Sequence, residues 1–137
     1  METNFAFLCD AASQGSDGKF NALGIGVSQI RATQVPAQHA RLVMVAEVGY
    51  TLAEAGTKTL LLRVIDDDGA DLMPPVTGEI AFNEHQDAET LSPVAHLVLE
   101  MNALTFPRFG RYSVDLQLDG VSIASMPLEL RPAPAVV

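Results

Sequence analysis

The alternation of apolar and polar residues is clearest between Tyr112 and Leu118. Tyr112, Val114, Leu116 and Leu118 alternate with polar residues, which is the period of a strand with one buried face. Asp119-Gly120 follows, and a second apolar run then leads to Leu130. Asp-Gly between two such runs is a strong hairpin signal, because both turn residues must reach positive φ. The pattern therefore predicts a hairpin within Phe106–Leu130.

Segments of the same kind precede this hairpin. The expected strands are Asn4–Ala11, Phe20–Val27, Ala40–Tyr50, Thr57–Ile65, Leu72–Phe82 and Val94–Phe106. Further Asp-Gly turns stand at residues 17–18 and 68–69. The stretch LAEAG at 52–56 is either a helical turn or a loop, and the loop is favoured because five residues ending in glycine are too short for a stable helix. We therefore expect about eight to nine strands and no long helix.

Glycine and proline mark the expected irregular places. Gly24 and Gly26 predict a bulge or a bend in the second strand. Pro74-Pro75 cannot donate to a strand ladder and predicts an edge or a kink. The near-continuous apolar character of 57–65 favours a position inside its sheet. Residues 83–93 form the longest polar stretch, and we expect a loop there.

Short strands with this punctuation are typical of an antiparallel sandwich or a barrel, and the sandwich is favoured. Pro107, Gly110 and Tyr112 resemble the immunoglobulin-like corner in which a tyrosine hydroxyl bonds back to the upstream backbone. We expect an all-β, immunoglobulin-like sandwich over residues 1–131, followed by a frayed tail at 132–137.

Composition and charge argue against some classes of binding partner. The chain has 137 residues, 48% of them hydrophobic, and a single cysteine, Cys9, so its core does not depend on an internal disulfide. The net charge of −9 and the scattered basic residues argue against nucleic acid and anionic membranes. No secretory signal pattern or membrane-spanning run is recognisable, and we expect a cytoplasmic protein.

The sharpest acidic cluster comprises Asp66, Asp67, Asp68 and Asp71. Carboxylates on one loop are ligands for Ca²⁺, but their spacing around Gly69 does not fit a helix-loop-helix calcium site. Asp66, Asp68 and Asp71 are therefore only weak metal candidates. The favoured interpretation is a solvated turn whose aspartates suit the turn geometry.

Other chemistry has little support in the sequence. His39, His85 and His96 lack metal-ligand spacing, and Cys9 continues an apolar alternation typical of a buried thiol. There is no GxSxG motif, and Gly24-Ile25-Gly26 lacks the other parts of a phosphate loop. We expect no catalytic residues, no cofactor and no enzyme activity.

Aromatic and basic residues are densest near the predicted corner. Arg108, Phe109, Arg111 and Tyr112 form a candidate recognition patch, with arginine forks suited to a carboxylate, sugar or peptide. The favoured interpretation is a packed corner, with the aromatic rings in the core and the arginines paired to acidic residues.

Three segments carry a family resemblance. NFAFLCDAA at the start, GKFNALGIG after it, and LVLEMNALTFPRFGRYSVDLQLDG near the end resemble a bacterial family of small, uncharacterised single-domain proteins. The resemblance covers nearly the whole chain and implies a β-sandwich of unknown role. It implies no catalytic or binding residues.

The absence of a catalytic pattern and the presence of several potential edge strands favour an interaction or assembly module, with a protein partner or a second copy as its target. The alternative is a ligand-binding module that holds a small molecule or Ca²⁺ in loops at one end of the sandwich.

Overall fold

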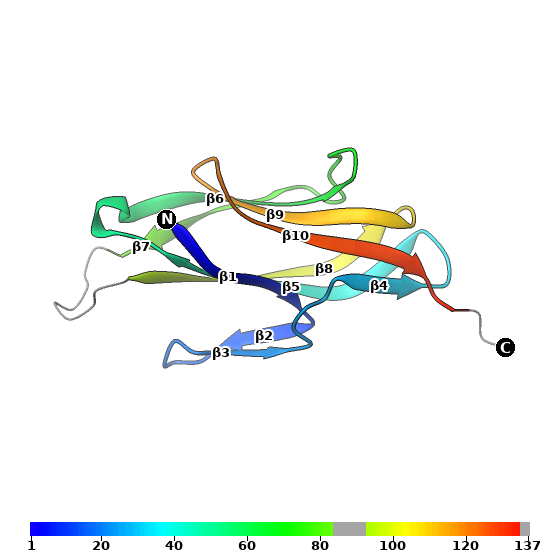
Figure 1. Cartoon of the computed structure of the whole chain (residues 1–137), viewed down its shortest axis with the longest axis horizontal. Coiled ribbons are helices and arrows are strands. Elements are labelled where there is room, and N and C mark those ends of the chain that lie inside the picture. Colours follow the sequence, from blue (N-terminus) through cyan, green and yellow to red (C-terminus); the bar gives the residue numbers. More distant parts are fainter. Residues whose placement is uncertain (84–92, 135–137) are drawn as a thin grey trace.

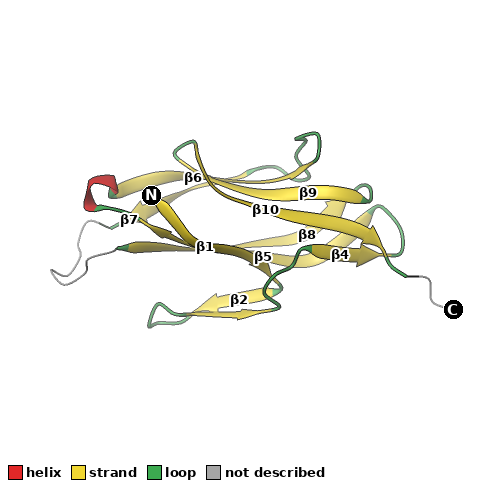
Figure 2. Ribbon diagram, viewed as in Figure 1, coloured by secondary structure: helices red, strands yellow, loops and turns green. Residues whose placement is uncertain are grey.

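Strands form three layers in the computed structural model, which describes residues 1–83 and 93–134 (Figures 1 and 2). The ten strands of this part of the chain are β1 (Glu2–Cys9), β2 (Ala11–Gln14), β3 (Phe20–Leu23), β4 (Gln29–Ala32), β5 (Ala37–Gly49), β6 (Gly56–Asp66), β7 (Val76–Phe82), β8 (Val94–Phe106), β9 (Gly110–Leu118) and β10 (Val121–Pro132).

Two sheets face each other across the core. The first has the strand order β1-β5-β8, and the second has the order β4-β10-β9-β6-β7. All pairs are antiparallel except β4 with β10. The predicted all-β, immunoglobulin-like sandwich is therefore confirmed, and β6 lies inside its sheet as expected.

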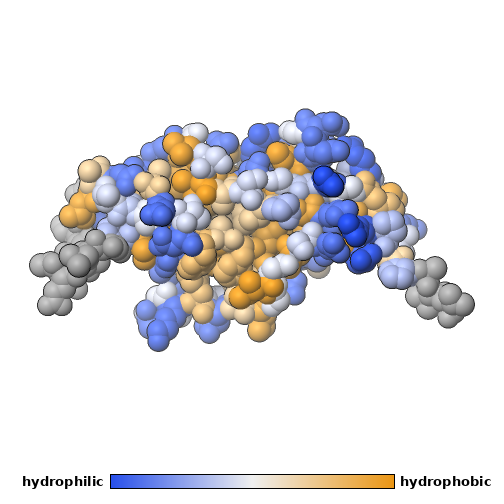
Figure 3. Space-filling model, in the orientation of Figure 1, coloured by the Kyte–Doolittle hydropathy of each residue, from blue (hydrophilic) through white to orange (hydrophobic). Residues whose placement is uncertain are grey.

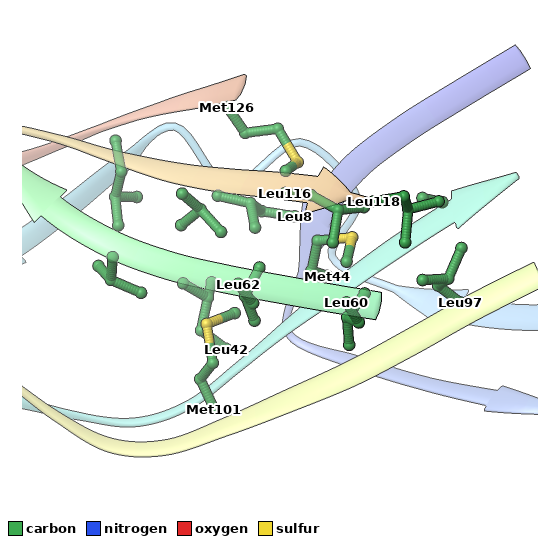
Figure 4. Packing of buried hydrophobic residues seen from close by; sticks show 14 of the residues in the cluster. Leu8, Leu42, Met44, Leu60, Leu62, Leu97, Met101, Leu116, Leu118 and Met126 are labelled. Carbon is green, nitrogen blue, oxygen red and sulfur yellow. The ribbon is translucent and has the colours of Figure 1, made fainter. Parts of the chain in front are cut away.

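Alternating residues of both sheets fill the space between them. Leu62 of β6, Leu116 of β9, Met44 of β5 and Leu97 of β8 all point into this core (Figure 4). Leu62, Leu116 and Met44 have no exposed surface, and Leu97 is almost fully buried. Because the side chains of a strand alternate between its faces, the period seen in the sequence selects these residues for the core.

A third layer covers the outer face of the smaller sheet. The hairpin β2–β3 lies beneath β1 and β5 (Figure 1) and contacts β5 and β8. Under it, Cys9, Val43 and Val45 form a second buried cluster. This layer explains why β5 is apolar on both faces over its middle residues.

The first half of the chain departs from the expected strands. The second strand ends at Leu23, because Gly24 and Gly26 adopt positive φ of 67° and 94° and turn the chain out of the hairpin. Residues 29–32, which lie outside every expected strand, form β4 and pair in parallel with the end of β10. Residues 52–54 form one turn of 3₁₀ helix, so the favoured loop interpretation was wrong.

The remaining turn predictions hold. The β9–β10 hairpin turns at Asp119 and Gly120, both with positive φ. β7 begins directly after Pro74-Pro75 and is an edge strand. The polar stretch 83–93 falls mostly outside the described residues, as does the end of the expected tail. Among the described residues, no helix has the length and apolar character to cross a membrane.

Candidate functional site

The aspartate loop after β6 contacts an arginine that lies 42 residues after Asp66 in the sequence. Oxygen atoms of Asp66, Asp67 and Asp68 lie within 4.8 Å of one another. The Arg108 Nη2 atom lies 3.0, 3.3 and 3.6 Å from these three carboxylates, respectively. The structure thus joins the two candidate sites of the sequence, because Arg108 of the predicted patch supplies the positive charge to the predicted cation loop.

Asp66 and Asp71 have separate partners. Oδ1 of Asp66 accepts hydrogen bonds from the backbone N–H groups of Asp68 and Ala70, each at 2.9 Å. Asp71 lies apart from the cluster, where its carboxylate receives two bonds from the Arg63 guanidinium at 2.9 and 3.2 Å. These bonds are the geometry of an Asx turn and a surface ion pair.

The hydrogen bonds to Asp66 predict an acid-sensitive loop. The Ala70 backbone N–H, followed by Asp68 and Arg108, lowers the pKa of Asp66 below 3.8. A lowered folded-state pKa contributes stability above the unfolded pKa, and this contribution is lost as the pH falls through the folded pKa. We expect stability to decline as the pH falls below about 4, the ordinary pKa of an aspartate, and Asp66→Asn to remove part of that decline. Urea midpoints measured above and below this pH test it; identical pH profiles for the two proteins would contradict it.

Tyr112 forms the predicted corner. Its hydroxyl donates a hydrogen bond of 2.6 Å to the carbonyl oxygen of Arg108, and its ring is buried edge-on against Phe106, with centroids 4.9 Å apart. This bond ties the start of β9 to the loop that carries Arg108. The corner resemblance drawn from the sequence is confirmed.

Removing the Tyr112 hydroxyl measures how much its hydrogen bond to the Arg108 carbonyl contributes to stability. We expect Tyr112→Phe to lower the free energy of unfolding by about 1 kcal/mol, because the Arg108 carbonyl loses its donor while the ring stays packed. Urea denaturation measures the change. A Ser122→Ala variant on the exposed part of β10 serves as the control; a loss no larger in Tyr112→Phe than in this control would show that the corner bond does not contribute.

The other members of the predicted patch point to different surroundings. Phe109 is half-buried and packs against the main core. Arg111 is exposed and lies opposite Glu129 in the β9–β10 ladder. Of the four members of the predicted patch, Arg108 and Arg111 are exposed, Phe109 is half-buried and Tyr112 is buried.

The remaining candidates of the sequence are also placed. Burial raises the pKa of the Cys9 thiol, which lies under the hairpin with no exposed surface. His96 of β8 is half-buried and bonds through Nε2 to Glu47 at 2.8 Å. His39 is half-buried on β5, and His85 lies outside the described residues.

The feature that sequence reasoning did not single out is the free edge of β8. β8 is thirteen residues long and pairs with β5 along one edge, and no other described strand pairs with its second edge. The other sheet edges are shorter or covered. β4 and β7 have four and seven residues, and the Leu8 carbonyl of β1 accepts bonds from Gly26 and Val27.

The hydrogen-bond alternation identifies which groups of β8 are unpaired. The Tyr50 N–H donates to the Pro93 carbonyl at 3.1 Å, and the β5–β8 register continues without a shift from there. In an antiparallel pair, residues alternate between bonding to the partner strand and pointing away from it. The backbone N–H and C=O groups that point to the free edge therefore belong to Val94, His96, Val98, Glu100 and Asn102.

The free edge of β8 carries few charged side chains that would prevent pairing with another strand. Between residues 94 and 102, Glu100 is the only acidic residue, and its carboxylate is paired with Arg41 at 3.1 Å. Natural sheets usually guard long free edges with lysine, proline or a covering segment. The sequence signal for this site was the long, nearly uncharged run 94–106, but strand order was needed to place it at an edge.

An apolar groove is the second notable surface. It has a volume of about 770 Å³ and runs between the hairpin β2–β3 and β1. Its lining includes Phe5, Phe7, Phe20, Ile25 and Arg41. Figure 3 shows apolar surface across the middle of the molecule between β10 and the hairpin.

Comparisons with known proteins give a family and one distant structural likeness. Among curated proteins, none matches this chain. Of solved structures, the chain is similar to the Pseudomonas fluorescens alkylpurine DNA glycosylase AlkC bound to DNA containing an abasic site analog, with 15% identity and a TM-score of 0.40. The match covers 76% of this chain and 28% of that one. Residues 4–131 match the family model DUF6941, a family of unknown function, and the chain therefore belongs to that family.

Proposed function

We propose that this protein is a non-enzymatic interaction module that recruits another polypeptide by strand addition to β8. The observation that carries the proposal is the unpaired edge of β8 at residues 94–102. Backbone groups at such an edge bind any extended chain, and the alternating side chains select among chains. A cytoplasmic location and a protein partner agree with the acidic composition and the lone buried thiol.

The geometry of the loops supports interaction over ion binding. Arg108 already supplies a positive charge to Asp66, Asp67 and Asp68, and Arg63 does so for Asp71. A calcium ion would have to displace these arginines. The aspartate loop is therefore a structural element in this proposal.

Ligand binding is the second candidate function, and the groove beside the hairpin is the observation that favours it. Its volume of about 770 Å³ falls within the range of small-molecule sites. A thermal-shift screen with apolar acids and with Ca²⁺ tests this alternative, because a ligand at 100 times its Kd adds about 2.7 kcal/mol of stability. A saturable shift with any of these compounds would favour ligand binding.

A pair of substitutions at Val98 tests strand addition. Val98→Pro removes one N–H that points to the free edge and is not needed by the β5–β8 ladder. Val98→Thr keeps the N–H and the β-branched shape, so it is the matched control. We expect partners captured from the native cell extract to bind wild-type protein and Val98→Thr but not Val98→Pro.

Folding is checked by thermal denaturation of both variants, since Val98 also packs against the cluster under the hairpin. If folded Val98→Pro retained the same partners as Val98→Thr, recruitment through the β8 edge would be refuted.

A further inference from the structure

A second copy of this chain is the partner that best fits the free edge of β8. We infer that two copies pair their β8 strands antiparallel about a two-fold axis at Val98, joining the two three-stranded sheets into one. This inference rests on the proposed function and names the occupant of the same edge. A second copy is supported by the set of residues within 94–102 that face each other across this two-fold axis.

A two-fold axis restricts the register strongly. Each residue before the axis must face the residue equally far after it in the other copy. An axis at Val98 therefore places His96 opposite Glu100 of the other copy, twice by symmetry, and Val94 opposite Asn102. These are the residues whose backbone groups point to the free edge, so each such pair can exchange two hydrogen bonds.

Neighbouring registers are less favourable. An axis at Glu100 puts two carboxylates opposite each other, and an axis at His96 puts two imidazoles together. An axis at Leu97 or Leu99 places Glu100 opposite a valine. Because like charges directly opposite each other destabilise a sheet, these side chains favour the register about Val98, which sets each Glu100 carboxylate opposite an imidazole.

The core side of β8 agrees with this register. Leu99 is half-buried, whereas its neighbours Leu97 and Met101 are 4% and 2% exposed. The axis at Val98 brings Leu97 of the second copy opposite Leu99, where it would cover the remaining apolar surface. The acidic loop at residues 66–68 belongs to the other sheet, so the pairing does not bring the two loops together across the new ladder.

Engineered cysteines test the register. Cys9 has no exposed surface, so new cysteines supply the reactive thiols. In the double variant Val94→Cys/Asn102→Cys, the two thiols of one strand are about 27 Å apart and cannot join each other. Across the proposed dyad, each lies opposite its counterpart at about 5.5 Å between Cα atoms, within reach of a disulfide.

We expect mild oxidation to convert the double variant to a covalent dimer, while Val94→Cys alone and Asn102→Cys alone form little disulfide-linked dimer. Light scattering on wild-type protein should give a mass approaching twice 14.6 kDa at high concentration, and Val98→Pro should give a monomer. Equal cross-linking of the single variants would overturn the register.

A monomeric wild-type protein at every concentration, with no cross-linking of the double variant, would overturn the second copy as partner. The proposed function would still stand if Val98→Pro then lost partners from the cell extract that Val98→Thr kept. The two proposals therefore fail under different results.

Discussion

Replacing Phe106 by alanine is expected to lower the free energy of unfolding by about 3–5 kcal/mol, as for other fully buried phenylalanines. Phe106 ends β8 and has no exposed surface. Its ring meets the Tyr112 ring edge-on at 75°, so the substitution removes one wall of the corner as well as apolar contact. Domains of this kind are stable by only about 5–15 kcal/mol, so the loss is a large fraction of the total.

Urea denaturation of Phe106→Ala and Phe106→Leu measures this effect. We expect leucine to restore most of the stability, because it fills most of the volume that alanine leaves empty. Additivity with Tyr112→Phe is also informative: residues in contact should show a coupling energy. A loss below about 1.5 kcal/mol for Phe106→Ala would contradict the close packing of this corner.

Replacing Phe20 by alanine is expected to release the hairpin β2–β3 from the outer face of the smaller sheet. The Phe20 ring contacts the His96 ring at 4.6 Å and the Phe5 ring at 6.2 Å between centroids. Because the ring is half-buried, we expect a cost of about 2 kcal/mol, roughly half that of a fully buried phenylalanine.

The rate at which the Cys9 thiol is labelled measures the release of the hairpin. Its thiol is buried under the hairpin, where Sγ contacts the Ala11 carbonyl at 3.5 Å. If the hairpin opens locally, a loss of about 2 kcal/mol speeds the labelling of Cys9 by a thiol reagent about 30-fold. Val121→Ala, on an exposed side chain of β10, is the control and should leave the labelling rate unchanged.

The comparison of labelling with global unfolding decides between two explanations. Labelling of Cys9 that accelerates while the urea midpoint changes little would show that the hairpin opens by itself. Unchanged labelling in Phe20→Ala would mean that Phe20 does not hold the third layer in place.

His96 belongs both to the free edge of β8 and to the contact between β8 and the hairpin β2–β3. This residue faces Glu47 within its own sheet and bonds to Gln14 of the hairpin at 3.3 Å. In the proposed dimer it also lies opposite Glu100 of the other copy. Release of the hairpin by Phe20→Ala should therefore weaken the dimer as well, which links the second prediction to the proposed interface.

Much of the fold was predictable from local sequence. The alternation in β9, the Asp119-Gly120 turn and the Tyr112 corner were all recognised correctly, because they depend on residues close in the chain. The strand β4 was missed, because four residues with half-polar character become a strand only when the end of β10 pairs with them.

The site shows the same division. The sequence by itself determined an acidic, all-β domain with a packed tyrosine corner, since side-chain period, turn chemistry and composition are local properties. Only the tertiary structure decided that Arg108 closes the aspartate loop, that a hairpin covers β5, and that β8 lies at an edge. These three facts depend on which distant segments become neighbours, and the apolar pattern of a strand is the same whether one or both of its edges are paired.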